Sequence, residues 1–104
     1  MDNLKPMYEV DFQKVDHSRT IEYYIFARLE RLEDLLPNKS YIKLKFKFMG
    51  IRRISGAMEI RTKDRLFSAH AISRDVIDCF DDLEAIIMDQ IDTWKRNRIF
   101  SYAI

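Results

Sequence analysis

Residues 41–49 alternate apolar and basic side chains, and this alternation constrains the fold more than any other feature of the sequence. Ile42, Leu44, Phe46 and Phe48 occupy every second position, and Lys43, Lys45 and Lys47 lie between them. Successive side chains of a β-strand point to opposite faces of the sheet. The pattern therefore predicts a strand with one buried apolar face and one face lined by lysines.

Three further segments have the same period. Residues 8–12 alternate apolar and acidic side chains, which favours a short strand with one buried face. Residues 56–62 place Met58 and Ile60 on an inner face, and residues 66–72 place Phe67, Ala69 and Ala71 on one face. Turns are expected at residues 50–55 and 63–65. The sequence thus predicts four strands, the last three of them in a meander.

Two segments have helical periodicity instead. After Ser18, a plausible N-cap, apolar residues recur every three or four positions up to Leu36, and Pro37 disfavours helix beyond them. The second helix is capped by Asp75 and runs to about Arg98, with acidic residues at its start and basic residues at its end. That charge gradient complements the helix dipole. Its apolar stripe consists of Val76, Phe80, Leu83, Ile87, Ile91 and Trp94.

The expected order is β-α-β-β-β-α, an α+β fold in which two helices pack on one face of a four-stranded sheet. With 104 residues, the chain is expected to form a single domain over residues 1–104. Residues 99–104 form an apolar tail after the second helix. Two interpretations of this tail stay open. It folds back on the sheet or core, or it forms a homodimer or partner interface with Phe26, Phe100 and Tyr102.

Catalytic signatures are missing from the sequence. Glycine occurs only at positions 50 and 56, so no glycine-rich phosphate loop exists, and His17 and His70 lack partners at metal-binding spacing. We therefore predict no enzyme activity, no cofactor, no metal and no small-molecule substrate. The one cysteine, Cys79, is interpreted as a packing residue. A single cysteine and the lack of a long apolar run predict a cytoplasmic protein without a membrane segment.

Two stretches of the chain resemble a known family. They are residues 21–33 (IEYYIFARLERLE) and residues 68–75 (SAHAISRD), the latter followed by residues 80–83 (FDDL) and by Gln90 and Ile91. Their order and spacing are similar to the ribosome hibernation-promoting factor and ribosome-associated inhibitor family, also called protein Y. The resemblance covers residues 8–98 and implies a short form. It implies a translation inhibitor that binds the small ribosomal subunit during stress.

The resemblance also suggests which side chains would contact ribosomal RNA. Arg28 and Arg31 match basic residues of the family's first helix, and Lys95 matches one near the end of the last helix. The remaining candidates are basic residues near these or on the sheet and its turn: Lys43, Lys45, Lys47, Arg52, Arg53, Arg96 and Arg98. Structural alternatives stay open for them, because such residues also pair with helix carboxylates, complement a helix end or protect a sheet against aggregation.

The chain departs from the family pattern on its helices. Family members commonly carry basic residues where this chain has Ile86, Asp89 and Thr93. Asp92 adds another acid, and Asp34 stands where a basic residue often follows the first-helix motif. Carboxylates repel phosphates, so these residues oppose the usual binding mode. Two outcomes follow: altered ribosome binding, or a protein-interaction module on the same fold that has left the ribosome.

Overall fold

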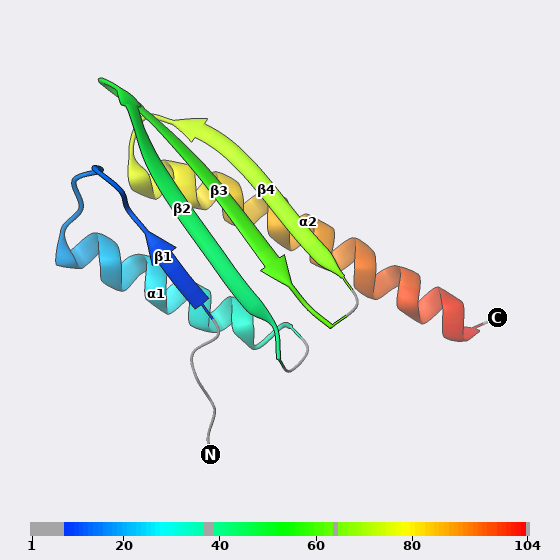
Figure 1. The fold of residues 1–104 in the computed structure, drawn as a ribbon. Helices are drawn as coiled ribbons and strands as arrows, with labels where there is room; N and C mark the ends of the chain where they lie inside the picture. Colours follow the sequence, from blue (N-terminus) through cyan, green and yellow to red (C-terminus); the bar gives the residue numbers. More distant parts are fainter. Residues whose placement is uncertain (1–7, 37–38, 64, 104) are drawn as a thin grey trace, which may run out of the picture.

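The computed structural model describes residues 8–36, 39–63 and 65–103, the last six of these by their backbone only. Its elements are β1 (Tyr8–Asp11), α1 (Arg19–Glu33), β2 (Tyr41–Gly50), β3 (Arg53–Arg61), β4 (Leu66–Ser73) and α2 (Val76–Ala103). The predicted β-α-β-β-β-α order is confirmed. The sheet order is β1-β2-β3-β4, with β1 parallel to β2 and the other pairs antiparallel (Figure 1).

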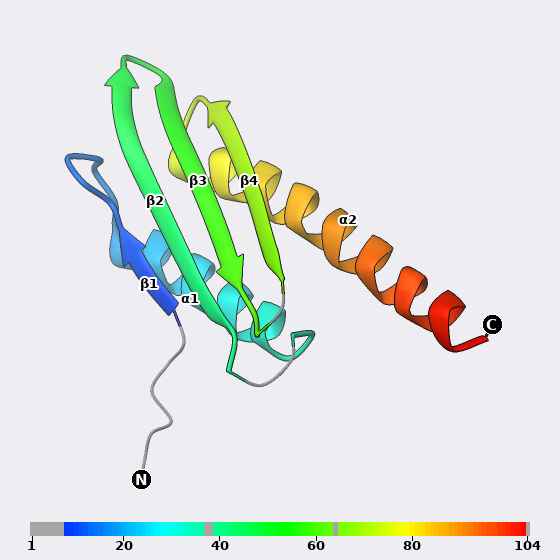
Figure 2. The same ribbon diagram turned by 45° about the vertical axis from the view of Figure 1, so that its right-hand side comes forward.

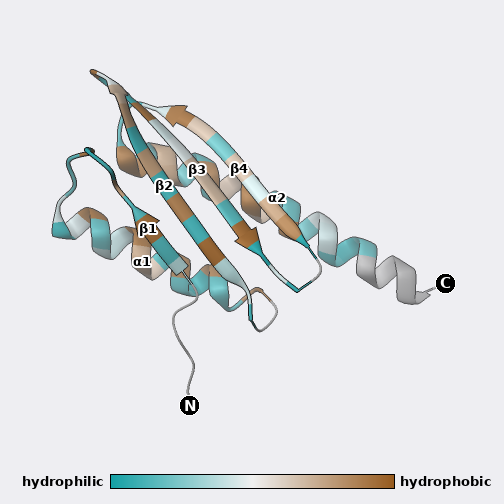
Figure 3. Cartoon of the chain, viewed as in Figure 1, coloured by the Kyte–Doolittle hydropathy of each residue, from teal (hydrophilic) through white to brown (hydrophobic). Residues whose placement is uncertain are grey.

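Both helices lie on the same side of the sheet, and the opposite side is open (Figure 1, Figure 2). The alternation in β2 produces this division. Ile42, Leu44 and Phe46 are fully buried, whereas the lysines between them are exposed. The same alternation appears as successive hydrophobic and hydrophilic bands along β2 in Figure 3.

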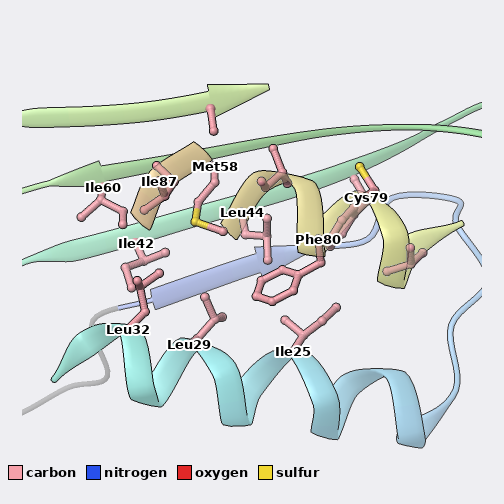
Figure 4. Packing of buried hydrophobic residues seen from close by; sticks show 14 of the residues in the cluster. Ile25, Leu29, Leu32, Ile42, Leu44, Met58, Ile60, Cys79, Phe80 and Ile87 are labelled. Atoms are coloured by element: carbon pink, nitrogen blue, oxygen red, sulfur yellow. The ribbon is translucent and has the colours of Figure 1, made fainter. Parts of the chain in front are cut away.

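The core is a single apolar layer between the sheet and the helices. Helix α1 contributes Ile25, Leu29 and Leu32, and α2 contributes Phe80 and Ile87, all of which point toward the buried side chains of the strands (Figure 4). Burial of these side chains is the main favourable contribution to folding. The three-residue and four-residue spacing in the sequence therefore identified the helix faces correctly.

Gly56 allows α2 to lie close to the sheet. A Cβ atom at this position of β3 would lie 2.6 Å from the Cys79 sulfur and 2.9 Å from Cδ1 of Leu83. Both distances are shorter than real Cβ contacts. The missing side chain at Gly56 therefore sets the separation between α2 and the sheet.

The predicted helix starts are confirmed. The Ser18 hydroxyl accepts a hydrogen bond from the backbone N–H of Ile21 at 3.2 Å. A carboxylate oxygen of Asp75 accepts one from the backbone N–H of Asp78 at 2.9 Å. Each cap satisfies a backbone donor that has no partner within its helix.

Both predicted helix ends are wrong. Helix α1 ends at Glu33 rather than Leu36, because the backbone N–H groups of Leu35 and Leu36 bond to carbonyls three residues earlier, in a tighter turn. Helix α2 does not stop near Arg98 but continues through Ala103. No proline or glycine follows Arg98 to end it. The expected tail therefore belongs to the helix, and the side chains of Arg98, Phe100 and Tyr102 lie outside the described residues.

The hairpin between β2 and β3 is tighter than the sequence predicted. Strand β2 extends to Gly50 and β3 starts at Arg53, so the turn is residues 51–52 rather than 50–55. Gly50 at φ 143° and Arg52 at φ 56° have backbone conformations that reverse the chain within this short turn. Arg53, expected on a loop, is thus the first residue of a strand.

Phe48 was predicted to be buried with Phe46, but it is 54% exposed. It pairs with buried Ile54, so it lies on the inner face of the sheet. Its exposure arises because the hairpin extends beyond the part of the sheet that the helices cover (Figure 2).

We predict that Gly56→Ala lowers the free energy of unfolding by about 1–3 kcal/mol, the usual cost of overpacking a core. The added methyl group must displace the Cys79 sulfur or Leu83. Urea denaturation followed by circular dichroism measures the loss.

Ala57→Ser, one position along on the open face, serves as the control and should change stability by less than about 0.5 kcal/mol. Equal stabilities of Gly56→Ala and the native chain would show that α2 does not need this close approach.

Candidate nucleic-acid interface

The open face of the sheet carries a row of cations. Lys43, Lys45 and Lys47 are all exposed there, as predicted. The strand register places Lys43 between Glu9 of β1 and Glu59 of β3, and Lys45 beside Asp11 of β1, whereas Lys47 lies beside Ser55. The surroundings of the row therefore become less acidic toward the hairpin.

The carboxylates that flank this row have partners of their own. Glu9 accepts a hydrogen bond from the Tyr41 hydroxyl, and Glu59 lies 3.9 Å from the guanidinium of Arg61. Asp11 accepts a hydrogen bond from the backbone N–H of Gln13 at 3.0 Å. None of the ion pairs among the described residues involves the three lysines of β2. Their ammonium groups remain available to an external anion.

The hairpin extends the cationic surface to the end of the sheet. Arg52 and Arg53 are exposed at its turn, next to exposed apolar side chains. Met49 is 48% and Ile51 is 87% exposed. The tip therefore combines positive charge with apolar surface, a combination that suits both the backbone and the bases of a nucleic acid.

Arg28 behaves differently from the sheet lysines. Its Nε donates to both carboxylate oxygens of Glu84 on α2, at 3.1 and 3.2 Å. The hydrogen bonds with Glu84 raise the pKa of Arg28 above its usual value. The side chain of Glu84 is only 15% exposed, so water contributes little to stabilising its charge. Arg28 supplies the compensating positive charge. This predicted RNA contact is thus occupied by an interhelical ion pair.

A second polar contact joins the same helices. The Tyr24 hydroxyl donates to a carboxylate oxygen of Asp81 at 2.7 Å. That hydrogen bond raises the pKa of Tyr24, and burial raises it further by a smaller amount. The Arg28 guanidinium lies 5.3 Å from the centre of the Tyr24 ring. Tyr24, Arg28, Asp81 and Glu84 therefore form one network that links α1 to α2. The pairing partners lie more than 50 residues apart in the chain, so sequence spacing gave no sign of it.

Helix α2 is acidic over most of its length. Residues 75–92 contain seven carboxylates and no basic residue: Asp75, Asp78, Asp81, Asp82, Glu84, Asp89 and Asp92. Asp89 and Asp92 are exposed, as is Asp34 at the end of α1. Of the other predicted contacts, Arg31, Lys95 and Arg96 are exposed on the helix side. The structure therefore does not bring all the predicted basic residues together, because they are divided between two opposite surfaces.

The predicted partner-interface residue Phe26 is half-buried. Its ring lies 5.6 Å from the Tyr8 ring and packs against the core. Tyr23, 75% exposed, lies beside it and is the larger apolar surface at this position. Sequence reasoning had not singled out Tyr23.

Cys79 is fully buried against the sheet. Burial, and then the charges of Asp82 and Asp75, raise the pKa of its thiol to about 11. A nucleophilic cysteine needs a lowered pKa and access to solvent. Cys79 has a raised pKa and is buried, so it has neither property.

Metal ligands do not cluster in the part of the chain that the structure describes: no three His, Cys, Asp or Glu side chains are placed to hold an ion. Across the same residues, no helix is long and apolar enough to cross a membrane.

Known proteins resemble this chain in their fold but not detectably in their sequence. No family model and no curated protein matches the sequence. Among solved structures, a ribosomal subunit interface protein from Coxiella burnetii matches with a TM-score of 0.70 at 20% identity, over 86% of this chain and 97% of that chain. The Protein Y N-terminal domain from Thermus thermophilus matches with a TM-score of 0.69 at 13% identity, over 82% of this chain and 93% of that chain.

The chain has the protein Y fold. The resemblance noted in the sequence is therefore confirmed at the level of fold. At these identities the protein Y fold says nothing about which surface residues contact a partner, and those residues have to be inferred from the geometry of this chain.

We predict that Arg28 acts mainly in stability. Arg28→Gln should lower the free energy of unfolding by about 1 kcal/mol, because it leaves the largely buried Glu84 without its charged donor. Urea denaturation of the single and double Arg28→Gln and Glu84→Gln variants gives the coupling between the two side chains.

The matched control is Arg31→Gln, three residues along the same helix and exposed, for which little change is expected. If the Arg28 and Arg31 variants lost equal stability, the interhelical pair would have no special role.

We also predict that Cys79 resists thiol reagents while the chain is folded. With a pKa near 11, the thiolate fraction at pH 8 is about a hundredfold below that of a thiol with the ordinary value of 9.0. Ellman's reagent should therefore react at a rate set by unfolding, and fast once urea is added. Labelling of the native chain as fast as that of free N-acetylcysteine would contradict the buried placement.

Proposed function

We propose that this chain binds ribosomal RNA of the small ribosomal subunit and inhibits translation without catalysing a reaction. The observation that carries the proposal is the row of cations on the open face of the sheet, which have no ion pair among the described residues and continue into the hairpin tip. The shared fold supports it, since one neighbour is a ribosomal subunit interface protein. A ribosomal partner implies a cytoplasmic location.

The sheet, rather than the helices, is the proposed contact surface. Folded RNA is recognised mostly through its phosphates and shape, and cations supply that attraction. Lys45, Lys47 and Arg53 face outward without a described ion pair, and Arg52 is exposed at the hairpin turn next to them. The exposed Asp89 and Asp92 on α2 would repel phosphates at the opposite surface.

The remaining basic candidates form a second, smaller group. Arg31, Lys95 and Arg96 are exposed on the helix side and stay in the proposal as secondary contacts, separate from the sheet surface. Arg98 stays with them by its position in the sequence. Arg28 leaves the group, because Glu84 already holds its guanidinium.

The alternative proposal is a protein-interaction module. The observation that favours it is the exposed ring of Tyr23, which lines a hollow of about 300 Å3 together with Phe26, Arg19 and Glu22. Such a surface suits a protein partner or a second copy of the chain. Under this proposal, loss of the sheet lysines leaves partner binding unchanged.

We predict that replacing Lys43, Lys45 and Lys47 together by Gln weakens binding to purified small subunits. The slope of log affinity against log salt concentration should fall by about three, because roughly one phosphate contact is lost per lysine. Co-sedimentation over a range of potassium chloride concentrations gives both quantities.

The matched control replaces Arg19, Lys63 and Arg65 by Gln, which removes the same formal charge away from the row of lysines. It should change the slope much less. Absence of the native chain from subunit fractions at low salt would reject the ribosomal proposal, and equal slopes for the two triple variants would reject the sheet as its surface.

A further inference from the structure

A hollow lies where the core layer ends beneath the β2–β3 hairpin. Three connections meet there: the loop between β1 and α1, the hairpin itself, and the turn between β4 and α2 (Figure 1, Figure 2). They meet because β1, β2 and β4 all end at the same edge of the sheet. The hollow has a volume of about 400 Å3, within the range of about 300–1,000 Å3 typical of small-molecule sites.

The walls of this hairpin hollow are apolar. Phe48 and Ile54 are a cross-strand pair on the inner face of the sheet, and Ile21 and Val76 belong to the starts of α1 and α2. Phe48 points to the side where the core lies but is 54% exposed, whereas Ile54 is 7% exposed. An aromatic side chain on the inner face thus remains uncovered by the chain itself, and it offers a flat surface to a ligand.

The rim of the hairpin hollow carries three cations from three separate elements. They are Lys14 from the β1–α1 loop, Arg52 from the hairpin turn and Arg74 from the β4–α2 turn. None of them belongs to an ion pair among the described residues. Arg52 has a backbone φ of 56°, a conformation that residues other than glycine rarely adopt, and it lines the hollow from the hairpin turn.

Two carboxylates also line the hollow. That of Asp75 is held at the start of α2 by the backbone N–H of Asp78, at 2.9 Å. The carboxylate of Asp16 has no such hydrogen bond among the described residues, and its charge would repel a bound anion. Three cations against two carboxylates leave a formal charge of +1, and the positive end of the α2 dipole adds to the attraction for an anion.

We propose that the hairpin hollow binds one nucleotide, with its base against Phe48 and its phosphate between Arg52, Arg74 and Lys14. A purely apolar ligand would not use the three cations, and inorganic phosphate would not use the aromatic wall. A nucleotide carries both chemistries. Its source is a free nucleotide or an unstacked residue of an RNA strand, and the RNA source rests on the proposed function.

The test uses the full chain with three probes: inorganic phosphate, adenosine 5′-monophosphate and a fluorescein-labelled five-residue oligouridine. Amide chemical shifts locate binding of the first two, and fluorescence polarisation at low salt measures the third. Shifts at the hairpin hollow with the monophosphate at concentrations where phosphate gives none support a site for a free nucleotide. Binding of the oligonucleotide alone supports the RNA source. Binding of none of the probes, or equal shifts with phosphate and the monophosphate, overturns the proposal.

Three substitutions give effects of different sign. Arg74→Gln should weaken nucleotide binding by about fivefold, since it removes one exposed charge. Phe48→Ala should weaken it by about fivefold or more through lost stacking. Asp16→Asn should tighten it, because it removes the opposing charge. Thermal unfolding of each variant checks that the fold is retained.

Arg65→Gln, at the opposite end of β4, is the matched control and should leave nucleotide binding unchanged. Equal weakening by Arg65→Gln and Arg74→Gln would mean that the probes sense only net charge. No tightening by Asp16→Asn would mean that Asp16 does not oppose the bound phosphate. Either result would overturn the proposal. Failure of the hollow and failure of the ribosomal proposal are separable, because the three lysines of β2 lie outside the hollow.

Discussion

The close approach of α2 to the sheet at Gly56 determines how the side chains of α2 meet the sheet and α1. Since β3 has no Cβ at this position, Cys79 and Leu83 can contact the strand directly. That contact fixes the height of α2 over the sheet. With the helix at this height, Asp81 and Glu84 lie beside Tyr24 and Arg28 of α1, and the polar network between the helices can form. One missing methyl group thus supports both the apolar core and the polar network.

The interhelical network also separates the charges of the molecule. Arg28 neutralises Glu84, so the charge of Arg28 does not offset the exposed carboxylates of α2 on the helix side. Acidic residues near the start of α2 stabilise the helix through its dipole, and this structural role gives them a reason to be there that is independent of any partner. The sheet side has no comparable demand on its lysines. The surface best able to attract an RNA is therefore the one that the helices do not cover.

The sequence predicted the fold well because the elements differ in period. The alternation from Ile42 to Phe46 and the helical spacing from Ile25 to Leu32 each correspond to burial that the structure confirms. These patterns are local, and so are the caps at Ser18 and Asp75. The parallel pairing of β1 with β2 is not local, and no pattern in the sequence specified it.

The predictions from the sequence that were wrong, or could not be made, also depend on what a local pattern can and cannot specify. The helix continues beyond Arg98 because a charge gradient suggests an end but does not stop a helix, whereas proline or glycine does. For the candidate site, the sequence could not show which cations already have a partner, because charge alone does not reveal an ion pair. Arg28 and Arg31 look equivalent in the sequence, and only the packing of α2 distinguishes them.

Phe48 shows how one feature of the strands accounts for both proposed surfaces. At the hairpin end, β2 and β3 extend beyond the helices that cover the sheet, so their alternation continues past the end of the core (Figure 2). On the open face, the extension carries Lys47 and Arg53, which prolong the row of lysines. On the inner face, it leaves Phe48 over a hollow instead of within the core. None of residues 47–53 is buried, so the packing of the helices does not require this extension of the hairpin, and both proposed surfaces draw on it.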